Sequence, residues 1–135
     1  QADATTPPLP WLEPGEPFPA PSQAWGQGSA APGLLAAGGQ LDANQLEQAY
    51  RQGVFPWYSA GQPVLWWSPD PRMVLDPQAL RLHRSLRQTL RRERLRPGTQ
   101  LCFDRDFQQV IRRCAQQVRP GQNGSWIVPD IEQAY

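Results

Sequence analysis

The stretch that decides the fold of this chain is Gly53-Val-Phe-Pro-Trp-Tyr-Ser-Ala-Gly-Gln-Pro-Val-Leu-Trp-Trp-Ser-Pro-Asp-Pro-Arg72. It holds five aromatic residues, four prolines and two glycines. The rings supply contact area, and proline restricts the backbone that carries them. The composition therefore predicts a rigid aromatic wall, which suits either a small core or the stacking of a planar ligand. Buried aromatic side chains are the commoner use, so composition alone favours the core.

The length of 135 residues is typical of about one domain, and the charge is unevenly divided. Residues 1–76 hold two Arg against seven acidic residues, whereas residues 77–135 hold eleven Arg against five. This asymmetry predicts a polyanionic partner for the second half. No apolar run approaches transmembrane length, so we expect a cytoplasmic protein without membrane contact. Cys102 and Cys114 lack metal-ligand spacing and are expected to be reduced, buried thiols.

Three segments are expected along the chain. Residues 1–32 hold eight of the sixteen prolines and predict an extended or partly disordered segment. Residues 33–120 predict an α+β domain with short strands and about three helices. Residues 121–135 open a further helix, and we expect the sequence to continue beyond it. Three rings could attach the first segment to the domain, namely Trp11, Phe18 and Trp25.

The first predicted helix starts after Asp42, which can cap it, with Gln45 as the reciprocal partner. Gly53 supplies its end. Short strands are expected at Val64–Trp67 and Met73–Leu75, around a proline-rich turn.

An arginine-rich helix is predicted at about Gln78–Arg92. Its leucines lie four residues apart and predict a buried stripe: Leu82, Leu86 and Leu90. Its arginines lie mainly on the opposite side: Arg84, Arg87 and Arg91, flanked by Arg81 and Arg92. Seven Arg between residues 81 and 96 face a single acidic residue, Glu93. The face is therefore either merely solvated or a phosphate-binding surface.

Further elements are expected after the Pro97-Gly98 turn. A strand is predicted at Gln100–Phe103, followed by a helix that Asp104 caps and that runs to about Gln117. The core stripe of this helix is Phe107, Val110, Ile111 and Cys114. The last helix begins at Pro129-Asp130 and places Ile131 and Tyr135 on one side.

A conventional catalytic apparatus is absent from the sequence. The single histidine, His83, has no evident nucleophile beside it, and no glycine-rich phosphate loop precedes a helix. The pair Asp104 and Asp106 is explained by capping and exposure, and metal ligands are lacking. We therefore predict no catalytic residue, no metal and no cofactor in this chain.

Binding of RNA is better supported than catalysis. Arginines release counterions when they neutralise phosphates, which gives salt-sensitive binding without sequence preference. Aromatic platforms stack the bases of single-stranded ends. Together the two features indicate a tRNA acceptor end, with Arg on the stem phosphates and rings on the terminal base.

Four ordered motifs, within a likeness that runs from about Pro10 to Tyr135, carry a resemblance to a known family. They are Pro32-Gly-Leu-Leu-Ala-Ala-Gly-Gly39, Ala49-Tyr-Arg-Gln-Gly-Val-Phe-Pro-Trp57, Leu65-Trp-Trp-Ser-Pro-Asp-Pro-Arg72 and Gly124-Ser-Trp-Ile127. The chain resembles the bacterial leucyl/phenylalanyl-tRNA–protein transferases. The resemblance implies a monomeric cytoplasmic enzyme that moves leucine or phenylalanine from aminoacyl-tRNA to a protein with N-terminal Arg or Lys, marking it for degradation. The resemblance also implies that the enzyme needs no cofactor.

The resemblance also implies roles for individual residues. Trp57 and Trp126 would hold the terminal adenosine, whereas Trp66 and Trp67 would mainly pack. The residues expected to contact tRNA are Arg84, Arg87, Arg91 and Arg92. Ser125 stands where the family usually has Thr, and Val128-Pro129 removes a capping hydroxyl at the start of the last helix.

The family's C-terminal domain has an acetyltransferase-like fold and supplies the amino-acid pocket and the acidic residues that assist the amine. Residues 121–135 match only the start of that domain, so we expect the 135-residue chain alone to transfer poorly. Two alternatives stay open. One is a non-catalytic tRNA- or RNA-binding module, and the other is a protein-interaction module built on the Pro/Trp-rich start.

Overall fold

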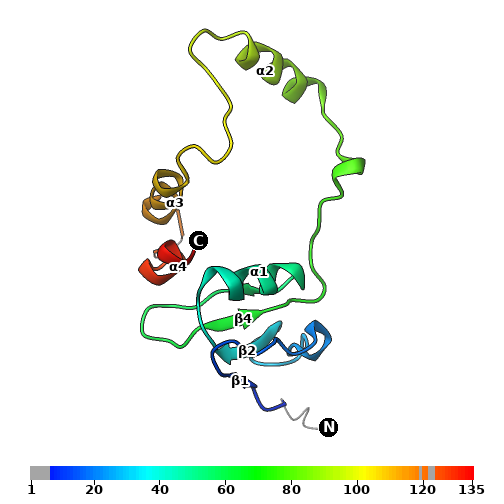
Figure 1. The fold of residues 1–135 in the computed structure, drawn as a ribbon. Helices are drawn as coiled ribbons and strands as arrows, with labels where there is room; N and C mark the ends of the chain where they lie inside the picture. The colour runs from blue at the N-terminus through cyan, green and yellow to red at the C-terminus, as the bar shows by residue number, and fades with distance from the viewer. Residues whose placement is uncertain (1–6, 119, 122–123) are drawn as a thin grey trace. The chain divides into compact units, whose positions relative to one another are not determined.

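The computed structural model describes residues 7–118, 120–121 and 124–135, which contain a small mixed sheet and several helices (Figure 1). The strands are β1 (Trp11–Leu12), β2 (Leu34–Gly38), β3 (Phe55–Pro56) and β4 (Leu65–Trp67). The α-helices are α1 (Ala43–Arg51), α2 (Arg84–Arg94), α3 (Phe107–Gln116) and α4 (Pro129–Ala134). Short 3₁₀ helices span Pro21–Gln23 and Pro77–Ala79. The predicted α+β class is confirmed.

The sheet has the strand order β1-β2-β4-β3. β1 runs parallel to β2, and the other neighbours are antiparallel. In the central pair Ala36 lies opposite Trp66, and at the edge Phe55 lies opposite Trp67. The edge position of β3 explains how Pro56 fits in a strand, because an edge strand can lack one backbone donor.

Trp66 forms the centre of the core. Its side chain is 0% exposed, its indole Nε1 donates to the Gly38 carbonyl at 2.9 Å, and Phe18 meets it edge-on at 4.8 Å between ring centroids. The remaining buried cluster comes from β1, β2, α1 and the turn after α1: Leu12, Leu35, Ala36, Leu46, Ala49 and Val54. The packing role predicted for Trp66 is confirmed.

Two glycines allow chain segments to approach closely. Gly33 has φ +89°, and a Cβ there would lie 2.8 Å from the Cα of Pro69. Gly38 has φ +82°, and a Cβ there would lie 2.8 Å from the Trp11 ring. A side chain at either position would strain the backbone and collide with a neighbour. The Pro32–Gly39 motif therefore reflects the dense packing around β2.

Helix α1 forms as the sequence predicts. The Asp42 carboxylate accepts a hydrogen bond from the Gln45 backbone N–H at 2.8 Å, and Gly53, with φ +74°, follows the C-terminus. One face of α1 buries Leu46 and Ala49 against the sheet. The predicted cap and stop are both confirmed, but the Gln45 side chain donates to the Glu16 carbonyl at 3.2 Å and is not the reciprocal partner of Asp42.

The N-terminal segment is attached to the sheet at several points. Residues 1–6 lie outside the described part of the chain. Beyond them, β1 pairs with β2, Phe18 is buried, and the Trp25 N–H donates to the Leu34 carbonyl at 2.8 Å. Trp11 is 63% exposed but covers Gly38. Trp11 and Phe18 therefore attach the segment through their rings, and Trp25 attaches it through its backbone N–H.

Arg72–Phe107 forms a separate compact unit. Its helix α2 begins at Arg84, later than predicted, and Met73–Leu75 and Gln100–Phe103 are irregular rather than strands. The strand predictions were wrong because strands need a paired neighbour, and this segment does not join the sheet. Leu82, Leu86 and Leu90 are exposed in the structure, so the expected burial of the leucine stripe is wrong here.

Helices α3 and α4 complete the described chain. α3 begins at Phe107, and Asp104 lies three residues earlier with φ +54°, so it is not the predicted cap. Of the predicted stripe, Ile111 is buried and the other members are exposed: Phe107, Val110 and Cys114. Both cysteines are exposed thiols, which corrects the expectation of burial. The apolar stripe of α3 is thus only partly used.

Ile131 of α4 is fully buried, and Glu132 pairs with Arg112 of α3 at 2.7 Å. Val128 occupies the N-cap position of α4 without a side-chain hydrogen bond, as the sequence predicts. Within the described residues, no helix is long and apolar enough to cross a membrane.

Candidate functional site

Trp57 is held by its backbone and presents its ring. It follows the edge strand β3, and its N–H donates to the Leu65 carbonyl at 2.9 Å. Its own carbonyl accepts the Trp67 indole N–H at 2.7 Å. The ring itself remains 54% exposed. A ring of this kind, exposed on a fixed backbone, suits the stacking of a planar ligand.

Trp126 lies in the turn that leads into α4. The Ser125 hydroxyl accepts the Ile127 N–H at 3.2 Å, and the Trp126 carbonyl accepts the Val128 N–H at 3.0 Å. Ser125 thus shapes the turn although the family resemblance expects Thr there. The Trp126 ring is half-buried and meets Tyr135 edge-on, with 6.5 Å between centroids.

Trp57 and Trp126 line one cavity, although 68 residues of sequence separate them. Its volume is about 310 Å³, and its other walls are Phe55 and Pro56. Apolar, aromatic walls of this kind bind planar ligands through stacking and exclusion of water. The structure therefore brings together the two tryptophans that the sequence analysis singled out.

A tyrosine pair borders Trp126 and was missed as a site feature by sequence reasoning. The hydroxyls of Tyr50 on α1 and Tyr135 after α4 are hydrogen-bonded, and their rings meet edge-on at 6.0 Å. Burial, followed by the hydrogen bond with Tyr50, raises the pKa of the Tyr135 hydroxyl above its ordinary value. Tyr135 therefore stays neutral at physiological pH. The sequence placed Ile131 and Tyr135 on one side of the last helix. It did not indicate that Tyr135 pairs with Tyr50.

The arginines of α2 form a basic surface within their own unit. Arg84, Arg87 and Arg91, together with Gln88, line a concavity of about 430 Å³. Arg92 lies outside this lining and sits 3.8 Å from the Glu93 carboxylate. The structure thus groups three of the four predicted tRNA-binding arginines. Such a surface is suited to anions, because guanidinium groups bind phosphate in a planar, bidentate manner.

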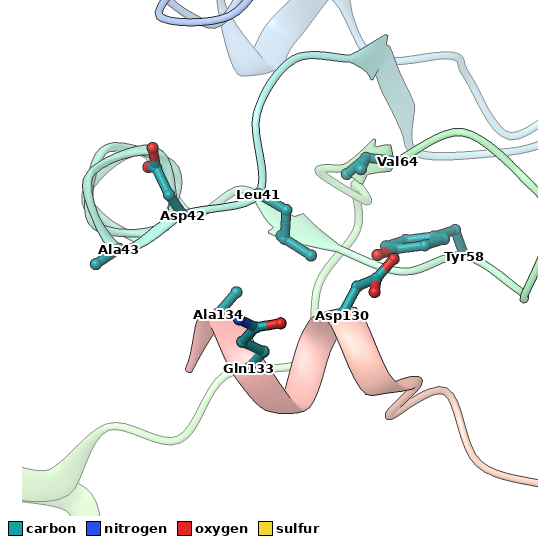
Figure 2. A pocket seen from close by; sticks show the side chains of 8 residues that line it. All are labelled: Leu41, Asp42, Ala43, Tyr58, Val64, Asp130, Gln133 and Ala134. Atoms are coloured by element: carbon teal, nitrogen blue, oxygen red, sulfur yellow. The ribbon is translucent and has the colours of Figure 1, made fainter.

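A further cavity of about 530 Å³ lies between α4, the start of α1 and the connection from β3 to β4 (Figure 2). Figure 2 shows the Tyr58 hydroxyl beside the Asp130 carboxylate, and Leu41 and Val64 line the same cavity. The Tyr58 hydroxyl is buried and has no hydrogen-bond partner among the described residues. Burial, and second the charge of Asp130, raise the pKa of Tyr58. Sequence analysis predicted neither residue, because their proximity depends on how α4 docks.

Within the described residues, no group of three or more His, Cys, Asp or Glu side chains could hold a metal ion. His83 precedes α2 and is exposed, and so are Asp104 and Asp106. The described residues do offer aromatic rings and guanidinium groups, both of which are suited to binding.

Two family models match parts of this chain. A model described as the leucyl/phenylalanyl-tRNA protein transferase N-terminal domain matches residues 39–70, and a model described as leucyl/phenylalanyl-tRNA protein transferase matches residues 74–135. The leucyl/phenylalanyl-tRNA–protein transferase of Albidiferax ferrireducens is 56% identical over 129 residues, which cover 96% of this chain and 51% of that protein.

Two further relatives carry the same name. The protein of Polaromonas sp. is 57% identical over 128 residues, which cover 95% of this chain and 50% of that protein. The protein of Paraburkholderia phytofirmans is 54% identical over 127 residues, covering 94% and 52% respectively. The chain thus spans about half the length of the curated relatives it matches. It belongs to the leucyl/phenylalanyl-tRNA–protein transferase family.

Proposed function

We propose that the protein transfers leucine or phenylalanine from aminoacyl-tRNA to the N-terminal Arg or Lys of an acceptor protein, which marks it for degradation. The observation that carries this proposal is the cavity shared by Trp57 and Trp126 in a chain of this family. The reaction would take place in the bacterial cytoplasm, with the enzyme acting as a monomer. Neither a metal nor a cofactor enters the proposal.

The proposed reaction exchanges an ester for an amide. The neutral α-amine of the acceptor attacks the carbonyl carbon of the aminoacyl ester, and the ribose oxygen leaves. One proton is lost by the attacking nitrogen and one is gained by the ribose oxygen. The ester is already activated, so positioning and proton handling supply the acceleration.

In this scheme the described chain contributes the nucleic-acid site. Trp57 and Trp126 hold the terminal adenine by stacking, which fixes the ribose and its ester. The Tyr135 ring meets Trp126 edge-on, and the Tyr135 hydroxyl is hydrogen-bonded to that of Tyr50. We assign no catalytic residue to residues 1–135. The amino-acid pocket and the acidic residues that assist the amine belong, in this proposal, to an acetyltransferase-like domain that begins near residue 121.

The basic surface of α2 would hold the phosphates of the acceptor stem. Arg84, Arg87 and Arg91 line one concavity, and we include Arg92 as a flanking contact. Because backbone phosphates are common to all tRNAs, this contribution is sequence-independent and weakens with salt.

The decisive experiment uses the product of the complete gene with leucine-charged tRNA and a peptide that starts with Arg. Mass spectrometry should detect one added leucine on this peptide and none on a matched peptide that starts with Ala. Absence of addition, with intact charged tRNA and folded protein, would overturn the proposal and favour a non-catalytic RNA-binding module.

A further inference from the structure

A second aromatic cavity adjoins the cavity of Trp57 and Trp126. It has a volume of about 460 Å³ and shares two wall residues, Phe55 and Trp57, with the first cavity. Its other walls include Trp67 and Gln62. Trp57 is thus common to two neighbouring spaces, of which the proposed function uses one.

The walls of this second cavity are fixed. The Trp67 indole N–H donates to the Trp57 carbonyl at 2.7 Å, which links the Trp67 side chain to the Trp57 backbone. On the opposite strand the Gly33 carbonyl accepts the Ser68 N–H at 2.7 Å, and Pro69 packs directly against Gly33. A cavity of a few hundred Å³ with fixed, mainly apolar walls is typical of a preformed small-molecule site.

One polar group faces this apolar space in a defined orientation. The Gln62 Oε1 accepts the Ser59 backbone N–H at 2.9 Å, within the turn that Gln62 N–H closes onto the Ser59 carbonyl at 3.0 Å. The amide oxygen is therefore occupied, and the Gln62 NH₂ group keeps its donors for a ligand. A ring edge with a carbonyl oxygen, such as O2 of a pyrimidine, matches such a donor.

We infer that this second cavity binds the nucleobase that precedes the terminal adenine of the tRNA 3′ end. The inference rests on the proposed function and deepens it. Consecutive bases of a single strand lie next to each other, and so do two cavities that share a wall. Aromatic side chains stack bases whatever the sequence. In a tRNA that base is a cytosine, whose O2 can accept from Gln62. Trp57 then serves two successive nucleotides.

The test compares two ligands that differ in one base. The dinucleotide cytidylyl-(3′→5′)-adenosine is titrated against an otherwise identical dinucleotide whose first residue is abasic. Calorimetry should show that the cytosine tightens binding by about 5- to 150-fold, the usual worth of one stacked base. Equal affinities would overturn the inference.

A matched pair of variants locates the effect. Ser59 lines the second cavity, whereas the neighbouring Ala60 does not, and both are exposed residues of one turn. Ser59→Trp should fill the cavity and abolish the advantage of the cytosine, while binding of the abasic dinucleotide changes less than twofold. Ala60→Trp should leave both affinities unchanged. Unaltered binding of the abasic ligand also shows that the Ser59→Trp protein is folded.

Other outcomes separate this inference from the proposed function. A Ser59→Trp variant that loses affinity for leucyl-adenosine, but not for the cytosine-containing dinucleotide, would assign the cavity to the amino-acid side chain instead. If neither dinucleotide binds and Trp57→Ala changes nothing, the adenosine site itself is refuted. If the abasic ligand binds through Trp57 without any gain from cytosine, only the second-base site is refuted.

Discussion

The sheet unit and the Arg72–Phe107 unit use similar apolar content in opposite ways. In the sheet unit Trp66 is 0% exposed and belongs to a cluster of buried hydrophobic residues. In the arginine-rich unit Met73 is 100% exposed, and the leucines of α2 face outward. Hydrophobic residues make a core only where paired strands or docked helices give them something to cover.

The same two units divide the chemistry of recognition. The sheet unit presents rings on a hydrogen-bonded backbone, of which Trp57 is the clearest example. The arginine-rich unit presents guanidinium groups on one helix. Stacking on fixed rings is short-ranged and specific in position, whereas attraction to phosphates is long-ranged and sensitive to salt. Four predictions test this division, in order of expected effect.

The largest effect is expected from Trp66→Ala. Removal of the central ring should lower the free energy of unfolding by about 3–5 kcal/mol, because the cavity left behind cannot fully collapse. Met73→Ala, in the other unit, should change it by less than about 0.5 kcal/mol. Urea unfolding of both variants measures the difference. Equal losses would show that both units have real cores and would remove the contrast.

Trp57→Ala should weaken binding of a leucine-charged tRNA 3′ end by about 1–3 kcal/mol, the usual stacking loss. Trp11→Ala is the control, since this ring is 63% exposed but lies on the β1–β2 side of the sheet, outside the cavity. Binding is measured with a charged minihelix at constant salt. Unchanged affinity of the Trp57 variant would remove this residue from the site.

Arg84→Ala combined with Arg91→Ala should reduce the slope of log affinity against log salt by about 1–2, as two phosphate contacts are lost. Arg51→Ala serves as control, because Arg51 is paired with Glu47 on α1, in the sheet unit. Titrations of tRNA at several salt concentrations give the slopes. A slope that does not move would mean that the face of α2 is merely solvated.

The smallest effect concerns pH. The pKa of Tyr58 is raised above 10.0 in the folded protein by burial and second by Asp130. Its contribution to stability is therefore complete below pH 10 and is lost as the pH rises through the folded pKa. Tyr58→Phe should flatten the alkaline fall in unfolding free energy, and Asp130→Asn should flatten it less. Urea midpoints at neutral and alkaline pH provide the measurement, and identical pH profiles of wild type and Tyr58→Phe would contradict it.

Local signals in the sequence were sufficient for part of this structure. The Asp42 cap and the Gly53 stop depend on residues within one turn, and both were predicted correctly. The strand at Leu65–Trp67 was found because apolar β-formers sit between two turns. The wrong strand at Met73–Leu75 had the same local pattern but no partner to pair with. Pairing is a property of the whole fold, which a short window does not contain.

The site shows the same limit. Trp57 and Trp126 were identified through motifs that match a family, and the structure brings them to one cavity. Tyr58, Tyr135 and the second aromatic cavity arise from the docking of α4 and from the turn after β3. Their residue types are ordinary for a core, so only the spatial arrangement shows that the Tyr135 hydroxyl meets Tyr50 and that the Tyr58 hydroxyl has no partner among the described residues.

The two hydrogen bonds that hold the Trp57 backbone to β4 have a consequence for the entropy of binding. A ligand that stacks on a ring must usually order the chain that carries it, at a cost of about 1–2 kcal/mol per backbone residue. At Trp57 that ordering is completed when the sheet forms, and only the two side-chain torsions remain to be restricted. Folding of the sheet has therefore already restricted most of the backbone freedom that nucleotide binding would otherwise have to remove.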